Sequence, residues 1–361
     1  MITISLCMIV KNEEEVLAGC LNSVKEYCDE IIIVDTGSTD ETKKIASKFT
    51  KKIYDFKWID DFSAARNFAF SKARMDFIFW LDADDILLEN DQKKLRNLKK
   101  SLNTDIDAVS MNYILQFDEY GKPSFYFRRH RLVKRINNFQ WKGQVHEYLE
   151  VGGNILQADI AVTHRKNKKN KDQQSSDRNI KIYEKRLEKN EKFSPRDLYY
   201  YANELKDHRQ YNKAIQYYQK FINCDQGWYE DKIRACLYMS DIYRVKKEHE
   251  NECKLLLQTF KYDKPRPETC CKLGDYFLRK KLYYPAIYWF ETAVRTKYKN
   301  PQGFHHEAFS TWYPHLSLCF SYWRIGNKEK SIYHHEIVKN IRPNDPKVLY
   351  NEQFFNGTAK K

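Results

Sequence analysis

The chain of 361 residues carries a formal net charge of +14 at pH 7 and has a pI near 9.1, a length sufficient for two domains with sizeable cores and a charge that favours anionic partners. No apolar stretch approaches the roughly 20 residues of a membrane-spanning helix, and the nine cysteines show neither a disulfide framework nor a paired zinc motif. These features exclude a membrane-spanning protein and a disulfide-stapled secreted domain, and reduced thiols favour a cytoplasmic location.

The first 50 residues are predicted to form two strands that alternate with two helices. The apolar segment ITISLCMIV is typical of a buried strand, and the segment after it repeats apolar residues at helical spacing. A second strand, residues 31–34, ends at Asp35, and the turn TGSTD that follows is typical of a helix cap. Polar residues at successive strand ends indicate a parallel α/β sheet of the doubly wound, nucleotide-binding kind.

The most informative segment is FIFWLDADD, residues 77–85. An apolar run that stops at Asp82, with Asp84 and Asp85 close behind, predicts a buried strand that delivers carboxylates to its C-terminal edge. In open α/β sheets that edge binds ligands. Clustered carboxylates repel one another unless a hard cation such as Mg²⁺ or Mn²⁺ lies between them, and such a cation can hold a diphosphate. The alternative is a turn or a helix N-cap, which also places acidic residues after a strand.

Four motifs in order, SLCMIVKNE, IIIVDTGSTDET, WIDDFSAARNFAFSKA and LDADD, resemble those of the family 2 glycosyltransferases with the GT-A fold. Further on, RHRLVKR, FQWKGQVHEYL and AVTHR resemble a subset whose catalytic domain is fused to tetratricopeptide-like helices, in or near which are the S-glycosyltransferases of glycocin peptides. The resemblance covers residues 1 to about 170. It implies a Rossmann-like α/β GT-A domain with a mixed, mostly parallel sheet. It also implies inverting, metal-dependent transfer of a hexose or N-acetylhexosamine from a UDP-sugar, with Mg²⁺ or Mn²⁺ as cofactor.

The resemblance also assigns a donor site. Its residues are Val10, Asn12, Glu13, Asp35, Arg66, Asp82 and Trp141. The carboxylate of Asp35 suits uracil N3–H or a ribose hydroxyl, since both are donors, or else it caps a turn. The guanidinium of Arg66 can bridge phosphate oxygens, or it can pin its loop through a carboxylate such as Asp61. Trp141 either stacks on the sugar or the acceptor, or fills the core.

The metal ligands implied by the resemblance are Asp84 and His164. The last aspartate of Asp-x-Asp coordinates the cation directly, while Asp82 contacts ribose or reaches the metal through water. The cation acts as a Lewis acid that neutralises charge on the departing diphosphate. His164, in VTHR, either completes the shell of the metal or the diphosphate, or is a structural hydrogen-bonding residue.

Inverting transfer needs a base that takes the proton of the acceptor while the sugar is attacked. The segment FQWKGQVHEYLE lies where family 2 enzymes present an acidic catalytic residue, and it reads His-Glu where the usual pattern is Glu-Asp. The expected catalytic residues are therefore Glu147, as the base, and His146, which binds donor or metal.

From about Asp172 the chain becomes rich in Tyr, Lys and Glu with helical periodicity, and an internal repeat is visible. Small and large residues recur between the copies, and Ala214 and Ala286 lie 72 residues apart, which is two repeats of 36. A degenerate copy fits around 237–260, and a fourth places Ser331 and Val338 at matching positions. Small residues allow paired helices to approach closely, so the pattern predicts tetratricopeptide-like helical pairs.

The expected organisation is a GT-A domain over residues 1–170, a linker and first helix over 171–195, and helical repeats over 196–361. The basic run RKNKKNK, residues 165–171, is expected to be a solvated linker, and it has no interleaved aromatics for nucleic acid. The expected acceptor is a peptide or protein side chain (Cys, Ser or Thr), recruited by the repeats, which could also form a homodimer. There are two alternatives. The acceptor could be a surface polysaccharide or a glycolipid, or the protein could be a catalytically inactive repeat scaffold.

Overall fold

The computed structural model describes residues 1–165, 171–296 and 303–357, except for the side chains of 171–176. The chain divides into two compact units, which are described separately. The first comprises Met1–Lys192 with Pro301–Phe304, and the second comprises Phe193–Asn300 with His305–Lys361. The unit boundary after Lys192 leaves helix α5 (Lys171–Glu188) with the first unit. Among the described residues, no helix is both long and apolar enough to cross a bilayer.

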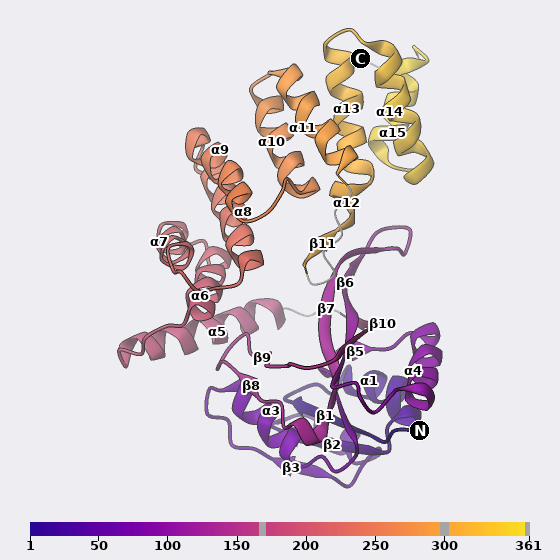
Figure 1. Cartoon of the computed structure of the whole chain (residues 1–361), viewed down its shortest axis with the longest axis vertical. Coiled ribbons are helices and arrows are strands. Elements are labelled where there is room, and N and C mark those ends of the chain that lie inside the picture. The colour runs from indigo at the N-terminus through magenta and orange to yellow at the C-terminus, as the bar shows by residue number, and fades with distance from the viewer. Residues whose placement is uncertain (166–170, 297–302, 358–361) are drawn as a thin grey trace. The chain divides into compact units, whose positions relative to one another are not determined.

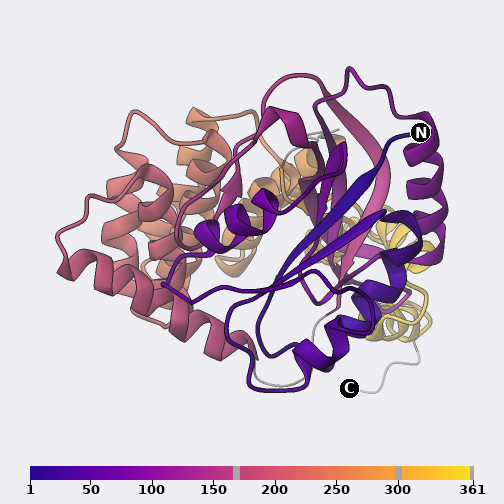
Figure 2. The same cartoon turned by 90° about the horizontal axis from the view of Figure 1, so that it is seen from below.

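The first unit is a mixed sheet with helices on both faces (Figures 1 and 2). The sheet order is β3-β2-β1-β4-β7-β6-β10-β5, while β8 and β9 form a separate small ribbon. The strands of this unit are β1 (Ile4–Val10), β2 (Glu30–Asp35), β3 (Ile53–Asp55), β4 (Phe77–Trp80), β5 (Asp85–Ile86), β6 (Ala108–Phe117), β7 (Pro123–Lys134), β8 (Trp141–Lys142), β9 (Tyr148–Leu149) and β10 (Ile155–His164). Its helices, besides α5, are α1 (Leu17–Val24), η1 (Lys25–Tyr27), α2 (Thr42–Ala46), α3 (Phe62–Ser71), α4 (Glu89–Ser101) and η2 (Arg135–Asn137).

The alternation of side chains along β1 divides the core into two layers. Leu6 and Met8 point to one face and pack with apolar residues of α1 and α4, such as Leu17. Cys7 points to the other face and packs with residues of α3, such as Ala69. Successive residues of a strand point to opposite faces, so an almost wholly apolar strand must be covered on both sides. This requirement explains why helices cover β1 on both faces of the sheet.

The strand pairing brings several strand ends to one edge. β1 pairs in parallel with β2 and β4, and Val10 lies opposite Asp35 in the register. β10 is antiparallel to β5, which sets His164 directly opposite Asp85. The pairs β2–β3 and β6–β10 are also parallel, whereas β7 is antiparallel to both of its neighbours β4 and β6. The expectation of a mixed, mostly parallel α/β sheet is confirmed.

The second unit consists of helical pairs. Its elements are α6 (Pro195–Asp207), α7 (Tyr211–Ile222), α8 (Tyr229–Val245), α9 (His249–Gln258), η3 (Thr259–Lys261), α10 (Pro267–Arg279), α11 (Tyr283–Arg295), β11 (His305–His306), α12 (Glu307–Ser310), α13 (Trp312–Arg324), α14 (Lys328–Ile341) and α15 (Pro346–Phe355). The pairs are α6–α7, α8–α9, α10–α11 and α13–α14. Each pair matches one copy of the sequence repeat, so the predicted tetratricopeptide-like helices are confirmed.

The same turn joins the two helices of every pair. A residue with positive φ ends the first helix each time, and these residues are Arg209, Lys247, Lys281 and Gly326. The next amide donates back to a carbonyl five residues earlier, as Leu282 N does to Phe277 O at 3.0 Å. This is the Schellman pattern that satisfies the last carbonyls of a helix. The buried positions of Ala214 and Ala286, both fully inaccessible, agree with their predicted role in close helix packing.

Candidate active site

The acidic cluster follows β4 in a tight turn. The amide of Asp82 donates to Asp85 Oδ2 at 3.0 Å, and the amide of Asp85 donates to Asp82 O at 3.0 Å. The carbonyl of Asp84 accepts from the amide of Arg165 at 2.8 Å, which ties this turn to the end of β10. The turn therefore holds three carboxylates together at the carboxyl edge of the parallel strands, as the sequence predicted.

Arg66 of α3 links two of the expected site residues. Its Nη2 donates to Asp82 Oδ1 and its Nε donates to Glu147 Oε1, both at 2.6 Å. The guanidinium lies over the rings of Trp80 and Trp141, at 5.1 and 4.7 Å from their centroids. Burial opposes ionisation of Asp82, but Arg66 and two further arginines outweigh it and hold the pKa of Asp82 well below its usual range. Arg66 is thus the centre of a charge network within the site.

A second ion pair, between Arg131 and Asp85, is buried at the acidic turn. Arg131 Nη2 lies 2.9 Å from Asp85 Oδ2, and both side chains are fully inaccessible. The guanidinium of Arg131 lies 3.9 Å from the centroid of the Trp80 ring. Burial raises the pKa of Asp85, although Arg131 acts in the opposite direction. A buried pair of this kind fixes the turn, because loss of either partner would leave an uncompensated charge in the interior.

Asp84, Asp85 and His164 form the one candidate metal group found among the described residues. Each offers a ligand atom, and these atoms lie within 4.8 Å of one another. Asp85 Oδ1 is buried without a hydrogen-bond partner among the described residues, and His164 Nδ1 lies 3.5 Å from Asp84 Oδ1, a contact that raises the pKa of His164. Two carboxylates and an imidazole suit a divalent cation. The residues present therefore fit the expected metal, and Asp85 joins the two ligands predicted from the sequence.

The ends of β1 and β2 carry the other expected donor residues. Asp35 Oδ1 accepts from the amides of Gly37 and Ser38, both at 2.9 Å, whereas Asp35 Oδ2 is buried without a partner. The Asn12 side chain accepts from the amide of Thr39 at 2.8 Å, which joins the two loops. Asp35 therefore does cap its turn, and it also keeps one carboxylate oxygen that no described residue satisfies.

Neighbours of Asp35 act through the backbone. Val10 is buried, and its carbonyl accepts from the amide of Thr36 at 2.9 Å. The amide of Glu13 donates to Thr42 Oγ1 at 2.7 Å, while its carbonyl accepts from the amide of Leu17 at the start of α1. These residues shape the edge of the sheet beside Asp35.

The β8–β9 ribbon brings the expected catalytic residues to the site. Asn67, next to Arg66 on α3, bonds the amide and the carbonyl of Trp141 at 2.8 and 3.0 Å. His146 has a left-handed backbone, with φ of 53°, and Glu147 follows it into the pair with Arg66. The ring of Trp141 is buried against Trp80 and under Arg66, so the structure places it in the packing rather than on an open surface.

The sequence analysis did not identify Trp80, Arg129 or Arg131 as site residues, nor Asp85 as a candidate metal ligand. Trp80 contacts all three arginines of the site. Arg129 and Arg131 are two residues apart in a segment with strand character. This spacing predicts that both side chains lie on the same face of the strand. Their acidic partners lie more than 40 residues away, so the sequence pattern did not identify them.

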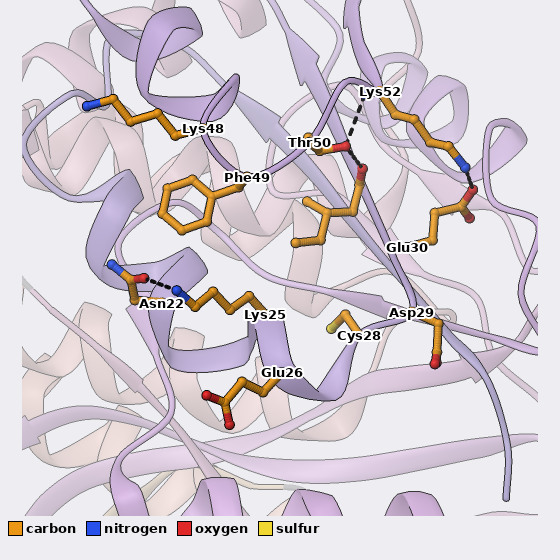
Figure 3. Close-up of a pocket in the computed structure, with 11 residues that line it drawn as sticks. Asn22, Lys25, Glu26, Cys28, Asp29, Glu30, Lys48, Phe49, Thr50 and Lys52 are labelled. Atoms are coloured by element: carbon orange, nitrogen blue, oxygen red, sulfur yellow. Dashed lines mark hydrogen bonds and ion pairs between the residues drawn. The ribbon is translucent and has the colours of Figure 1, made fainter.

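A separate pocket of about 600 Å³ lies at the opposite edge of the sheet, beside the start of β2 (Figure 3). Lys25, Lys48 and Lys52 line it together with acidic residues. Glu30 there is bonded to Ser5 and Lys52, and Lys25 donates to Asn22 at 2.9 Å. Figure 3 joins Lys25 and Lys52 to partners within the protein, whereas Asp35 Oδ2 and Asp85 Oδ1 at the other edge have no hydrogen-bond partner among the described residues.

Residues 5–154 match the family model described as Glycosyl transferase family 2. The chain is similar to a TPR repeat-containing protein of Synechococcus elongatus, with 37% identity over 42% of this chain and 36% of that protein. It is also similar to the SPbeta prophage-derived glycosyltransferase SunS of Bacillus subtilis, with 29% identity over 61% of this chain and 53% of that protein. It spans about a third to a half of the length of these curated relatives. Among solved structures, a glucosyl-3-phosphoglycerate synthase of Mycobacterium tuberculosis gives a TM-score of 0.35 at 14% identity, over 54% of this chain and 81% of that chain.

Proposed function

We propose that this chain, whose residues 5–154 form a family 2 glycosyltransferase domain, transfers a hexose or N-acetylhexosamine from a UDP-sugar to a peptide or protein side chain with inversion. The observation that carries the proposal is the group of Asp84, Asp85 and His164, which lies at the carboxyl edge of the parallel strands beside the network of Arg66, Asp82 and Glu147. A nucleotide diphosphate with its cation is the ligand class that suits such an edge.

The donor would lie across the ends of β1, β2 and β4. The free Oδ2 of Asp35 is available to a donor group of uracil or ribose, and the turn at Asp82 lies next to the cation ligands. Mg²⁺ or Mn²⁺, held by Asp84, Asp85 and His164, would supply charge neutralisation for the departing diphosphate. The pairs of Arg66 with Asp82 and of Arg131 with Asp85 keep these two carboxylates in place without reorganisation during the reaction.

Glu147 is proposed as the base and His146 as its neighbour on the donor or metal side. The β8–β9 ribbon carries both residues, and Asn67 anchors this ribbon to α3. One carboxylate oxygen of Glu147 is bonded to Arg66, which orients the other oxygen. A positioned carboxylate of this kind can accept the proton of the acceptor as the sugar carbon is attacked.

The peptide or protein acceptor is supported by the helical unit, because stacked helical repeats present an extended surface that suits a polypeptide. The similarity to the prophage-derived glycosyltransferase SunS over 61% of this chain supports the sugar-transfer part of the proposal. The same unit could pair with a second copy of the chain, and a gel-filtration measurement would test the homodimer.

The test of the proposal is the substitution Asp84→Asn, which keeps the size of the side chain and removes its charge. We expect the variant to lose hydrolysis and transfer of the UDP-sugar by roughly 10² or more, and to lose the Mg²⁺- or Mn²⁺-stimulated binding of UDP in calorimetry. Asp159→Asn is the matched control, since Asp159 is an exposed carboxylate paired with Lys94. Normal turnover of the Asp84 variant in the presence of a chelator would show that the metal assignment is wrong.

A further inference from the structure

Three guanidinium groups surround the ring of Trp80. Arg131, Arg66 and Arg129 lie 3.9, 5.1 and 5.6 Å from its centroid. All three also face Asp82, and each of them favours its ionised form. The electron-rich face of an indole ring attracts cations, so Trp80 gathers the positive charge of the site at the end of β4. A donor diphosphate that reaches this edge must meet one of these three groups.

Two of the three guanidinium groups form close ion pairs with carboxylates of the protein. Arg66 has a side chain that is only 9% exposed, and it is bonded to Asp82 and Glu147 while it lies against two tryptophan rings. Arg131 is fully inaccessible and faces Asp85. A diphosphate could displace neither of them without leaving a carboxylate buried and uncompensated, which is costly.

Arg129 differs from the other two in exposure and in its partners. Its side chain is 36% exposed, and its Nη1 lies 4.0 Å from Asp82 Oδ2, beyond hydrogen-bond distance. Within the described part of the chain, Asp82 is the only carboxylate in range of this guanidinium. The rings of Tyr113 and Phe127, at 5.1 and 5.3 Å, hold the group in place without using its N–H donors. Arg129 is therefore a positioned cation at the rim of the acidic turn, and none of the described residues accepts a hydrogen bond from its guanidinium.

We infer that Arg129 is the guanidinium that binds the diphosphate of the donor, and that Arg66 is a positioning residue for Asp82 and Glu147. The inference deepens the proposed function and rests on it. It reassigns the phosphate contact that the sequence suggested for Arg66. A guanidinium can donate to two phosphate oxygens at once. Arg129 can do so because its contact with Asp82, at 4.0 Å, is too long for a hydrogen bond.

The experiment compares the binding of UDP, uridine and inorganic pyrophosphate to the full chain by calorimetry in the presence of Mg²⁺. Arg129→Met keeps the apolar stem that packs on the aromatic rings and removes the charge. We expect this variant to bind UDP and pyrophosphate about tenfold to a hundredfold more weakly, the range for a hydrogen bond to a charged group. Uridine should bind with unchanged affinity. The affinity of Arg129→Lys for UDP and pyrophosphate should lie between those of Arg129→Met and the wild type, because lysine keeps the charge but lacks the two-pronged guanidinium.

Arg96→Met is the matched control. Arg96 also lies over an aromatic ring, that of Tyr27, and it forms a loose ion pair with Glu26 at 3.6 Å on α4 of the same unit. This variant loses the same charge, so it should leave the binding of all three probes unchanged. Circular dichroism and thermal melting establish that the Arg129 variants are folded.

Three results would overturn the inference. Unchanged UDP binding in Arg129→Met would show that the residue does not contact the diphosphate. Equal weakening of uridine and UDP would show a structural role. A wild-type chain that binds neither UDP nor pyrophosphate would refute both this inference and the proposed donor. By contrast, a chain that binds pyrophosphate through Arg129 but not UDP would refute only the uridine nucleotide.

Discussion

Arg66 determines how the residues of the candidate site are held. Its guanidinium lies over the rings of two tryptophans and forms ion pairs with two carboxylates, those of Asp82 and Glu147. The arrangement keeps Asp82 ionised and holds Glu147 close to the acidic turn. Dipoles and charges that are fixed before the reaction stabilise a transition state without the cost of reorganisation.

The substitution Glu147→Gln tests whether Glu147 is the catalytic base. The amide oxygen can still accept from Arg66 Nε, so the geometry of the site should persist. Removal of the carboxylate should lower sugar transfer by roughly 10² or more, while the affinity for UDP stays unchanged. Steady-state transfer and calorimetric UDP binding are the two measurements. If UDP affinity falls as much as turnover, Glu147 belongs to the donor site and the base must be another residue.

At the scale of the helix, Gly274 allows α10 and α11 to approach. A Cβ atom added at this position would lie 2.7 Å from the Phe290 ring, which is fully buried. Alanine favours a helix over glycine by about 1 kcal/mol, yet the clash with the ring opposes this gain. We expect Gly274→Ala to lower the free energy of unfolding by about 1–3 kcal/mol, measured by urea denaturation.

Two further variants separate the clash from other effects of this substitution. Gly152→Ala is the control, because a Cβ atom there would have no neighbour within 4 Å. Adding Phe290→Leu to Gly274→Ala should recover part of the loss, since the smaller side chain makes room. A Gly274→Ala chain as stable as the wild type would mean that the helices can move apart at no cost.

The pair α13–α14 contains a histidine contact that predicts a pH dependence. His315 Nδ1 and His334 Nδ1 lie 2.8 Å apart, so one neutral ring donates and the other accepts. Burial, followed by the nearby His315, lowers the pKa of His334 to about 4. The folded state therefore binds fewer protons than the unfolded state between about pH 4 and 6.5. The contribution of His334 to the free energy of unfolding is fully present above pH 6.5 and is lost as the pH falls toward 4.

The expected loss for His334 is about 2 kcal/mol of unfolding free energy between pH 7 and pH 5. His334→Phe keeps an aromatic ring against Tyr322, which stacks on His334 at a centroid distance of 5.7 Å, and removes the titration. The difference between the two stability curves, measured by urea denaturation at each pH, isolates the histidine. Parallel curves for the wild type and the variant would contradict the prediction.

At the scale of the whole molecule, the first unit contains all the residues of the proposed donor and metal sites. Helix α5 belongs to this unit as well, because Lys185 pairs with Asp60 at 2.6 Å and Arg178 lies over the Phe62 ring. A truncated chain should therefore end after Lys192 and keep α5. An earlier end would expose the surface that this helix covers.

We expect the chain 1–192 to retain binding of UDP and slow hydrolysis of the UDP-sugar, while transfer to a peptide acceptor falls by roughly tenfold or more without the second unit. Transfer of labelled sugar to cysteine- and serine-containing peptides is the measurement. Circular dichroism and gel filtration first establish that the truncated chain is folded and soluble. A folded truncated chain with the full transfer rate would show that the helical unit does not recruit the acceptor.

The sequence alone determined the alternation of strands and helices, the edge at which Asp35, Asp82 and Asp84 lie, and the helical pairs around Ala214 and Ala286. These features follow from local periodicity, because burial on one face or on both faces of an element leaves a regular pattern of apolar residues. The order of the motifs also predicted the resemblance to the family 2 glycosyltransferases, whose model matches residues 5–154.

The pairing of charged residues depends on contacts between distant parts of the chain. Arg66 pairs with Glu147 from 81 positions away, and Arg131 reaches Asp85 because β7 lies next to β4 in the antiparallel direction. His164 lies opposite Asp85 through the pairing of β10 with β5. Sequence spacing defines geometry within one element, whereas a buried ion pair depends on which strands are neighbours. The pattern therefore located the edge of the site, and the sheet topology decided the partners within it.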